Sequence, residues 1–295
     1  MILLNQLRPS ALLVGLFIVT ACSKPDPALV VPPTPVKPLV VVNSGPETTP
    51  ASQSTAWELT LDESFDKSLD DSRWRPEWPC QNGNSTCFFN GRYEAVYLAP
   101  NVSVADGNLT LETKQQNYID WDKKEYAFSS GVVTSAGGRF NQQYGYFEVR
   151  MKPTSTPGND PAFWLAAMNG WPPEIDIAEI PGGYAGKLCG QSLHAGPNDV
   201  FKSDGTIKNT DVGISNFNDA YHTYGLLWEA NKLVWYVDGK ETRRITNNVN
   251  VPDEPLFVLL SDEIRRDNGE WFGNPTAGTY PAKTQFDWVR VWKKK

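Results

Sequence analysis

Short alternations of apolar and polar residues recur along this chain, and they constrain its fold more than any other feature. Apolar side chains take every second position in residues 147–151 and alternate less regularly with polar ones in residues 286–292, which is the spacing of a β-strand with one buried face. Residues 233–237 form a short apolar run that leads into Asp238-Gly239, a dipeptide favoured in tight hairpin turns, before a polar return segment. No segment keeps helical spacing over three turns, and 23 glycines with 23 prolines favour short elements joined by turns. The pattern predicts an all-β fold, a sandwich of two antiparallel sheets.

An acidic segment within one predicted strand has an irregular spacing. Glu174 and Asp176 are two positions apart, so they share one face of a regular strand. Glu179 lies five positions after Glu174, an odd offset that would turn it into the core. One extra residue at Ile177-Ala178, a β-bulge, returns Glu179 to the acidic face. The sequence therefore predicts a bulge at this point.

Three carboxylates on one strand face repel one another, so solubility is a poor reason to place them together. The alternative is an ordinary strand face exposed to solvent. The segment follows Trp-Pro-Pro and is flanked by apolar residues, however, which is typical of a core strand that lines a cleft. A retaining glycosidase needs a nucleophile and a proton donor about 5–5.5 Å apart. The Cα atoms of Glu174 and Glu179 would be roughly 13 Å apart, so their side chains must lean together over a concave sheet.

The acidic segment resembles the signature of glycoside hydrolase family 16 in its bulged Glu-x-Asp-x-x-Glu form. That resemblance implies a β-jelly-roll sandwich with a concave substrate cleft, which cleaves β-1,3 or β-1,4 bonds with retention of configuration. It assigns Glu174 as nucleophile, Asp176 as assistant and Glu179 as general acid/base. The similarity extends over most of residues 57–295, through segments 101–109, 144–150, 161–165, 221–225 and 287–292.

Aromatic residues and one histidine are candidates for binding the sugar rings. Trp164 and Trp171 flank the acidic strand, and Trp271 follows later; each is alternatively a core residue. His194 resembles a cleft histidine of the family, with a structural hydrogen bond as the alternative. His222 is interpreted as structural.

Three departures from the family pattern lie near the predicted subsites and leave the polysaccharide open. Asp160 stands where a tryptophan is usual, residues 255–263 lack the usual Asn and Gly pair, and the loop before Glu174 is short. We therefore expect an endo-β-1,3-glucanase (laminarin-like). A β-agarase-type galactanase, a transglycosylase, or a sugar-binding sandwich that has lost catalysis are the alternatives; the intact acidic trio argues against the last.

Catalysis by this trio needs no cofactor, but the resemblance implies a structural calcium ion where the termini of the jelly roll meet. Its ligands would be Glu63, Asp287 and the backbone carbonyl of Gly107, since oxygen ligands from distant segments suit calcium. A plain surface pair of acids is the alternative.

The charge balance excludes some partners. With 27 Lys+Arg against 34 Asp+Glu, the net charge of −7 argues against nucleic acid, which needs a cationic face. Two histidines and four cysteines offer few ligands for a zinc cage. The expected partner is a polysaccharide, bound by a monomer.

The N-terminus predicts export. Residues 1–21 read as a signal peptide, with an apolar run too short to span a bilayer. They end in Val-Thr-Ala before Cys22, which resembles the lipobox of bacterial lipoproteins; an ordinary signal peptide is the alternative. Because Ser23 follows the cysteine, a Gram-negative host would place the lipid anchor in the outer membrane.

Residues 22–56 are proline-rich and predicted to be a disordered tether before a domain at 57–295. Cys80 and Cys87 could pair, leaving Cys189 free.

Overall fold

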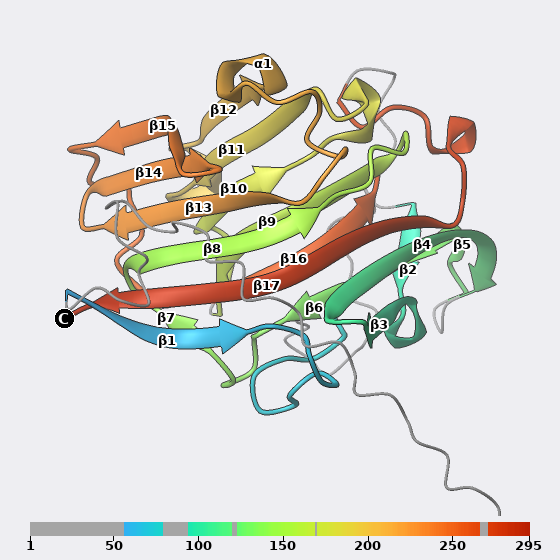
Figure 1. The fold of residues 1–295 in the computed structure, drawn as a ribbon, viewed down its shortest axis with the longest axis horizontal. Coiled ribbons are helices and arrows are strands. Elements are labelled where there is room, and N and C mark those ends of the chain that lie inside the picture. The colour runs from blue at the N-terminus through green and yellow to red at the C-terminus, as the bar shows by residue number, and fades with distance from the viewer. Residues whose placement is uncertain (1–55, 79–93, 120–122, 169, 266–270) are drawn as a thin grey trace, which may run out of the picture. The chain divides into compact units, whose positions relative to one another are not determined.

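Two β-sheets lie face to face in the computed structural model (Figure 1). The structure describes residues 56–78, 94–119, 123–168, 170–265 and 271–295. Almost all strand pairs are antiparallel; β2 and β5 pair in parallel. The prediction of an all-β sandwich is confirmed.

Ten strands form the first sheet, in the order β15-β14-β13-β8-β17-β4-β5-β2, with β1 paired to β17 and β3 to β4. Its inner face supplies apolar residues to the core between the sheets, such as Phe147, Val149, Leu226 and Trp235. The strands are β1 (Trp57–Glu63), β2 (Ala95–Tyr97), β3 (Val102–Ala105), β4 (Asn108–Ile119), β5 (Glu125–Ser130), β8 (Gly145–Lys152), β13 (His222–Glu229), β14 (Lys232–Val237), β15 (Lys240–Thr246) and β17 (Ala282–Lys294).

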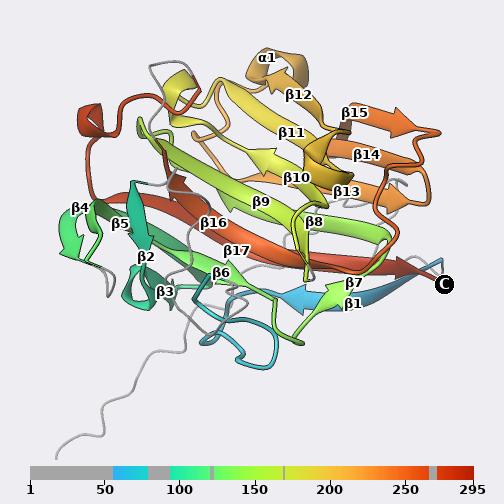
Figure 2. The same ribbon diagram turned by 180° about the vertical axis from the view of Figure 1, so that it is seen from behind.

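Seven strands form the second sheet, in the order β12-β11-β10-β9-β16-β6, with β7 paired to β16 (Figure 2). The strands are β6 (Val132–Thr134), β7 (Asn141–Gln142), β9 (Asn159–Ala167), β10 (Glu174–Glu179), β11 (Leu188–His194), β12 (Ser203–Lys208) and β16 (Leu256–Ile264). Every residue of β16 is buried, because one of its faces joins the core between the sheets and the other packs in a second apolar cluster with Trp164. Glu263, near its end, lines a cavity. The acidic segment lies near the middle of this sheet, on β10.

The predicted hairpin joins β14 and β15. Asp238 and Gly239 both have positive φ, 48° and 76°, as the turn type favoured by Asp-Gly requires. Asp238 also accepts a hydrogen bond from the backbone of Thr223, so the turn is tied to the start of β13. His222 is structural here, because its Nδ1 lies 2.7 Å from Oδ2 of the same carboxylate.

Helices are few and short in the described residues. They are α1 (Asn209–Val212) and four 3₁₀ turns, η2 (Ala99–Asn101), η3 (Gly182–Tyr184), η4 (Pro197–Asp199) and η5 (Pro275–Ala277). Within the part of the chain that the structure describes, no helix has the length and apolar character needed to cross a membrane.

Candidate active site

Strand β10 is bulged where the odd spacing of its acids requires it. Against β9, Asp176 pairs with Trp164 but Ala178 pairs with Phe163, so two residues of β10 take the place of one step on β9. The register against β11 shifts over the same stretch. The bulge predicted at Ile177-Ala178 is confirmed, and Ile175, Ile177, Ala178 and Ile180 are all buried in the core between the sheets.

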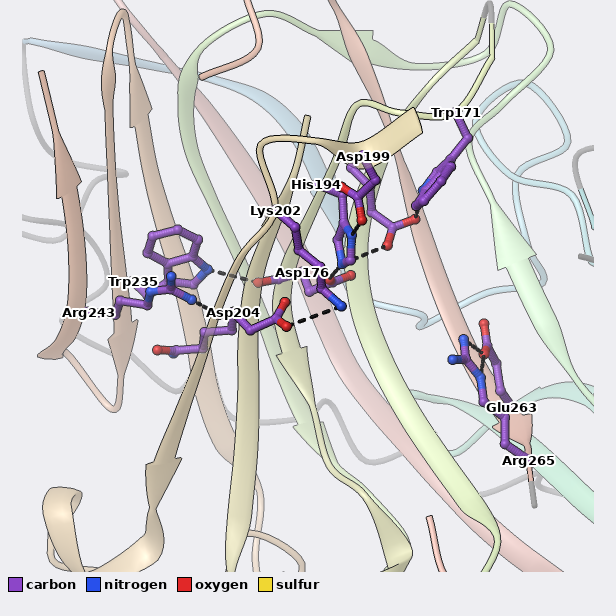
Figure 3. Close-up of polar contacts among 12 residues, drawn as sticks. Trp171, Asp176, His194, Asp199, Lys202, Asp204, Trp235, Arg243, Glu263 and Arg265 are labelled. Atoms are coloured by element: carbon purple, nitrogen blue, oxygen red, sulfur yellow. Dashed lines mark hydrogen bonds and ion pairs between the residues drawn. The ribbon is translucent and has the colours of Figure 1, made fainter. Parts of the chain in front are cut away.

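The other sheet supports this bulge directly. Trp235 on β14 donates its indole N–H to the backbone carbonyl of Asp176, at 2.8 Å (Figure 3). A bulge takes backbone groups out of the strand ladder, and a buried carbonyl without a partner is unfavourable. The tryptophan therefore satisfies the carbonyl at the point where the ladder is interrupted.

All three acids of β10 line one cavity, of about 690 Å³, on the face of the second sheet away from the core. Its walls come from strands β9, β10, β11, β12 and β16 and from the segments beside them. The lining residues are Asp160, Ala162, Trp164, Trp171, Glu174, Asp176, Glu179, Gly190, Ser192, His194, Lys202, Asp204, Gly205, Thr206, Glu263, Arg265, Trp271 and Phe272.

Glu174 is held by groups from two neighbouring elements. Trp171, in the loop before β10, donates its indole N–H to Oε2 of Glu174 at 2.9 Å. His194, opposite Glu174 on β11, places Nε2 3.7 Å from Oε1. A donor to a carboxylate stabilises its ionised form, so these contacts suit Glu174 to act as an anion.

Burial raises the pKa of each of the three carboxyl groups. For Glu174 and Asp176 the pKa lies well above the ordinary value, first because of burial and then because of a neighbouring carboxyl group, Asp176 and Glu179 respectively. For Glu179 burial also raises the pKa, against the attraction of Arg265. The acids repel one another, so the group loses its protons stepwise.

The predicted sugar-binding tryptophans differ in exposure. Trp171 is 44% exposed, and its ring lies 5.7 Å from that of His194. Trp164 is only 6% exposed and donates its N–H to Oγ of Ser261 at 3.0 Å. Trp271 is half-buried and meets Tyr184 edge to face. All three line the cavity, but Trp171 offers the most open ring.

The structure adds a buried acidic pair that the sequence interpretation missed. Asp160 on β9 pairs in register with Glu263 on β16, and both side chains line the cavity. Arg265 donates from Nε to Glu263 at 2.6 Å. Burial and the charge of Glu179 raise the pKa of Asp160 well above its ordinary value. Asp160 and the segment 255–263, which contains Glu263, both depart from the family pattern. These two departures were the sequence signal that could have pointed to the acidic pair.

A second acid–base pair lies on the opposite wall. Lys202 Nζ is 3.1 Å from Asp204 Oδ2, and both side chains are exposed. His194 lies between Asp199, in the loop after β11, and the acids of β10. Its Nδ1 lies 2.8 Å from Oδ2 of Asp199, and its Nε2 lies 3.4 Å from Oδ2 of Asp176. The ligand atoms of Glu174, Asp176 and His194 lie within 4.8 Å of one another and could hold a metal ion, although carboxylates in this role need none.

The residues predicted to bind calcium lie around β17. Glu63 pairs with Val289, and Leu109, two residues after Gly107, pairs with Phe286. Glu63 accepts hydrogen bonds from Phe65 and Trp74, and Asp287 forms an ion pair with Arg150. These donors engage both side-chain oxygens of Glu63 and one oxygen, Oδ2, of Asp287. The calcium ion stays a prediction.

Other predictions lie outside the described residues. They are the signal peptide, Cys22, the tether up to residue 55, and the pair Cys80 and Cys87. Cys189 is described; it is free, as predicted, and it is also buried.

Comparisons with known proteins agree with the geometry. The family model "Glycosyl hydrolases family 16" matches residues 89–290. The endo-1,3-1,4-beta-glycanase EglC of Rhizobium meliloti (strain 1021) is 30% identical over 227 residues, which are 74% of this chain and 46% of that protein. The glucan endo-1,3-beta-glucosidase A1 of Niallia circulans is 29% identical over 281 residues, 86% of this chain and 40% of that protein. The chain thus spans less than half the length of these relatives.

A solved structure shares the fold. The non-specific endo-beta-1,3(4)-glucanase SCLam superposes with a TM-score of 0.69 at 26% identity, covering 82% of this chain and 93% of that one. The bulged acidic strand, the cavity it lines and the family model over residues 89–290 agree. The chain belongs to glycosyl hydrolase family 16.

Proposed function

We propose that this chain is a retaining, endo-acting hydrolase of β-linked polysaccharides, with β-1,3-glucan as its substrate. The observation that carries the proposal is the bulged strand β10, which presents Glu174, Asp176 and Glu179 together to one cavity. A protein that only binds sugar has no use for three mutually repelling carboxyl groups.

The environment of each acid suggests its role. Glu174 accepts the N–H of Trp171 and would attack the anomeric carbon as a carboxylate. Burial raises the pKa of all three carboxyl groups, so the roles follow from contacts: with Glu174 held as the anion, Glu179 would protonate the glycosidic oxygen as the bond to the anomeric carbon breaks. Water then attacks the glycosyl ester, Glu179 takes its proton, and Glu174 leaves as a carboxylate. Asp176 lies between the two and biases their charges.

The charge of the cavity favours a neutral polysaccharide. Its lining holds six carboxyl groups (Asp160, Glu174, Asp176, Glu179, Asp204, Glu263) and two cations, Lys202 and Arg265. Each cation is already engaged by a carboxylate of the lining. A sulfated galactan would meet repulsion here, whereas a glucan would not. The names of the relatives, which refer to β-1,3 and β-1,3-1,4 glucans, support the same choice.

Product analysis tests the proposal. Incubated with laminarin, mixed-linkage β-glucan, agarose and carrageenan, the protein should release short oligosaccharides of retained configuration from laminarin first. Glu174→Gln serves as the inactive control. Cleavage of agarose alone would replace the proposal by the galactanase, and products longer than the starting oligosaccharides would indicate a transglycosylase.

We further propose that the enzyme is exported and tethered through a lipid on Cys22. The apolar segment and the small residues before Cys22 support this. Cys22→Ser should release the protein from the membrane fraction while the activity stays unchanged. Wild-type protein found freely soluble outside the cell would contradict the anchor.

A further inference from the structure

One side chain in the loop between β11 and β12 serves the site without lining its cavity. Asp199 directs Oδ2 to Nδ1 of His194 at 2.8 Å, and Figure 3 shows His194 between Asp199 and Asp176. Its other oxygen, Oδ1, is buried and has no hydrogen-bond partner among the described residues. The histidine is thus the main polar partner of this carboxylate.

The backbone of the loop is strained at this point. Asn198 and Asp199 have φ of 54° and 61°, in the left-handed region that residues with side chains seldom adopt. The conformation is fixed by hydrogen bonds from the backbone N–H of Asp199 to the carbonyl of Gly196 and of Phe201 to that of Ala195. Strain of this kind persists where the surroundings determine it, often beside functional sites. Here its result is a carboxylate placed behind the histidine ring.

The contact determines which nitrogen of His194 faces the acids. An ionised carboxylate can only accept, so Nδ1 of His194 is the donor toward Asp199. The other nitrogen, Nε2, then faces Asp176 Oδ2 at 3.4 Å and Glu174 Oε1 at 3.7 Å. With Nδ1 donating to Asp199, a proton on Nε2 as well makes the ring an imidazolium, the form that carboxylates on both sides of it favour.

We propose that Asp199 is a positioning residue for the reaction, which holds the His194 ring so that a proton on Nε2 keeps the nucleophile Glu174 ionised. This inference rests on the proposed function. It deepens that function, since Asp199 lies outside the acidic motif of β10.

The charges around Glu174 agree with this role. Burial and the carboxyl groups of Asp176, Glu179 and Glu263 raise the pKa of Glu174, and His194 is the group that opposes them. Lys202 and Asp204 on the neighbouring wall are paired with each other. Losing the support of Asp199 should therefore raise the pKa of Glu174, and the acid limb of the activity profile should move to higher pH.

Two variants separate charge from orientation. Asp199→Ala removes both, and we expect kcat/KM to fall about 10- to 100-fold, as for other partners that orient a histidine, with the acid limb displaced upward. Asp199→Asn keeps an acceptor for Nδ1–H but loses the charge. The fall in kcat/KM should therefore be smaller than in Asp199→Ala, while the acid limb of the pH–activity profile should still move to higher pH. In a His194→Ala background, Asp199→Ala should change kcat/KM less than twofold, because Asp199 acts through the histidine.

The chain offers a matched control. His222 and Asp238 form the same contact, Nδ1 to carboxylate at 2.7 Å, on the other sheet. Asp238→Asn should leave the acid limb in place. An unchanged limb and kcat/KM in Asp199→Ala, or equal shifts in Asp199→Asn and Asp238→Asn, would overturn the proposal.

A spectroscopic measurement tests the positioning independently of activity. The chain has only two histidines, so ¹⁵N–¹H long-range spectra of the imidazoles can be assigned with a His222 variant. Both Nδ1 and Nε2 of His194 should carry a proton in the wild type, and Asp199→Ala should lose that signature; an unchanged His194 signal would refute the positioning. Wild-type protein that hydrolyses no polysaccharide would instead refute the proposed function, and the spectra would still decide the role of Asp199.

Discussion

Strands β10 and β16 both carry buried carboxyl groups, but they surround them differently. Asp262 on β16 is fully buried, and its two oxygens accept hydrogen bonds from Asn159 at 2.7 Å and Thr284 at 2.9 Å. Asp176 on β10 lies among other acids and opens onto the cavity. The first arrangement satisfies a polar group inside the sandwich, while the second maintains repulsion that only a ligand or a proton relieves. Buried acids that stay poorly compensated beside a cavity are the ones to associate with catalysis.

The largest expected effect is that of Glu174→Ala, which removes the nucleophile from β10. Turnover should fall by at least about 10⁴-fold, because no covalent intermediate can form. Azide should restore activity and give a product of inverted configuration, since a small anion fills the vacated place. Glu58→Ala, on an exposed position of β1, is the control. Recovery of retained product with azide would show that Glu174 is not the nucleophile.

Glu179→Ala should reduce activity on polysaccharide by about 10²- to 10⁴-fold, the usual contribution of a positioned acid. A substrate with an activated leaving group needs no proton, so its cleavage by this variant should be much less impaired. The comparison is made by steady-state kinetics with a natural and an aryl glycoside. Equal losses on both substrates would contradict the role as acid.

Changes in chain length at the bulge test how β10 differs from a regular strand. Deleting Ala178 leaves Glu-x-Asp-x-Glu, which a regular strand presents on one face, so the variant should fold and keep part of its activity. Inserting a residue there also gives an even offset and leaves Ile180 on the core side, but it moves Glu179 two strand positions further from Glu174, so activity should be lost even if the variant folds. Thermal unfolding and activity check these outcomes. An insertion variant as active as the wild type, or a deletion variant that fails to fold, would overturn this account of the strand.

Asp262 should make stability depend on pH. Burial raises its pKa to about 7 in the folded protein, from 3.8. The folded state therefore binds the proton more tightly, and this stabilisation is present below pH 4 and lost as the pH rises to about 7. The loss amounts to on the order of 4 kcal/mol.

Asp262→Asn cannot ionise, so its free energy of unfolding should fall less than that of the wild type between pH 4 and 7. The acids of β10 contribute in the same direction, and the difference between the two proteins isolates Asp262. Asp253→Asn, at an exposed position, is the control for denaturant titrations. Parallel profiles for wild type and Asp262→Asn would show that this carboxyl is already ionised at pH 4.

Local sequence pattern determined much of this protein. Alternation over residues 147–151 and 286–292 predicted strands β8 and β17, because a strand turns alternate side chains to opposite faces. The Asp238-Gly239 dipeptide predicted its hairpin for the same local reason. The five-residue spacing of Glu174 and Glu179 predicted the bulge, since only an extra residue keeps both Ile175 and Ile180 in the core.

Tertiary structure decided what depends on pairing between distant segments. Asp160 meets Glu263 only because β9 and β16 are neighbours in one register, about a hundred residues apart in sequence. Trp164 and Trp171 are equally aromatic and close in sequence, yet packing against Ser261 buries one and leaves the other open. Asp199 reaches His194 through a left-handed turn that no local pattern announces. Strand register and loop conformation are set by the packing of the whole sandwich, and spacing along the chain does not contain them.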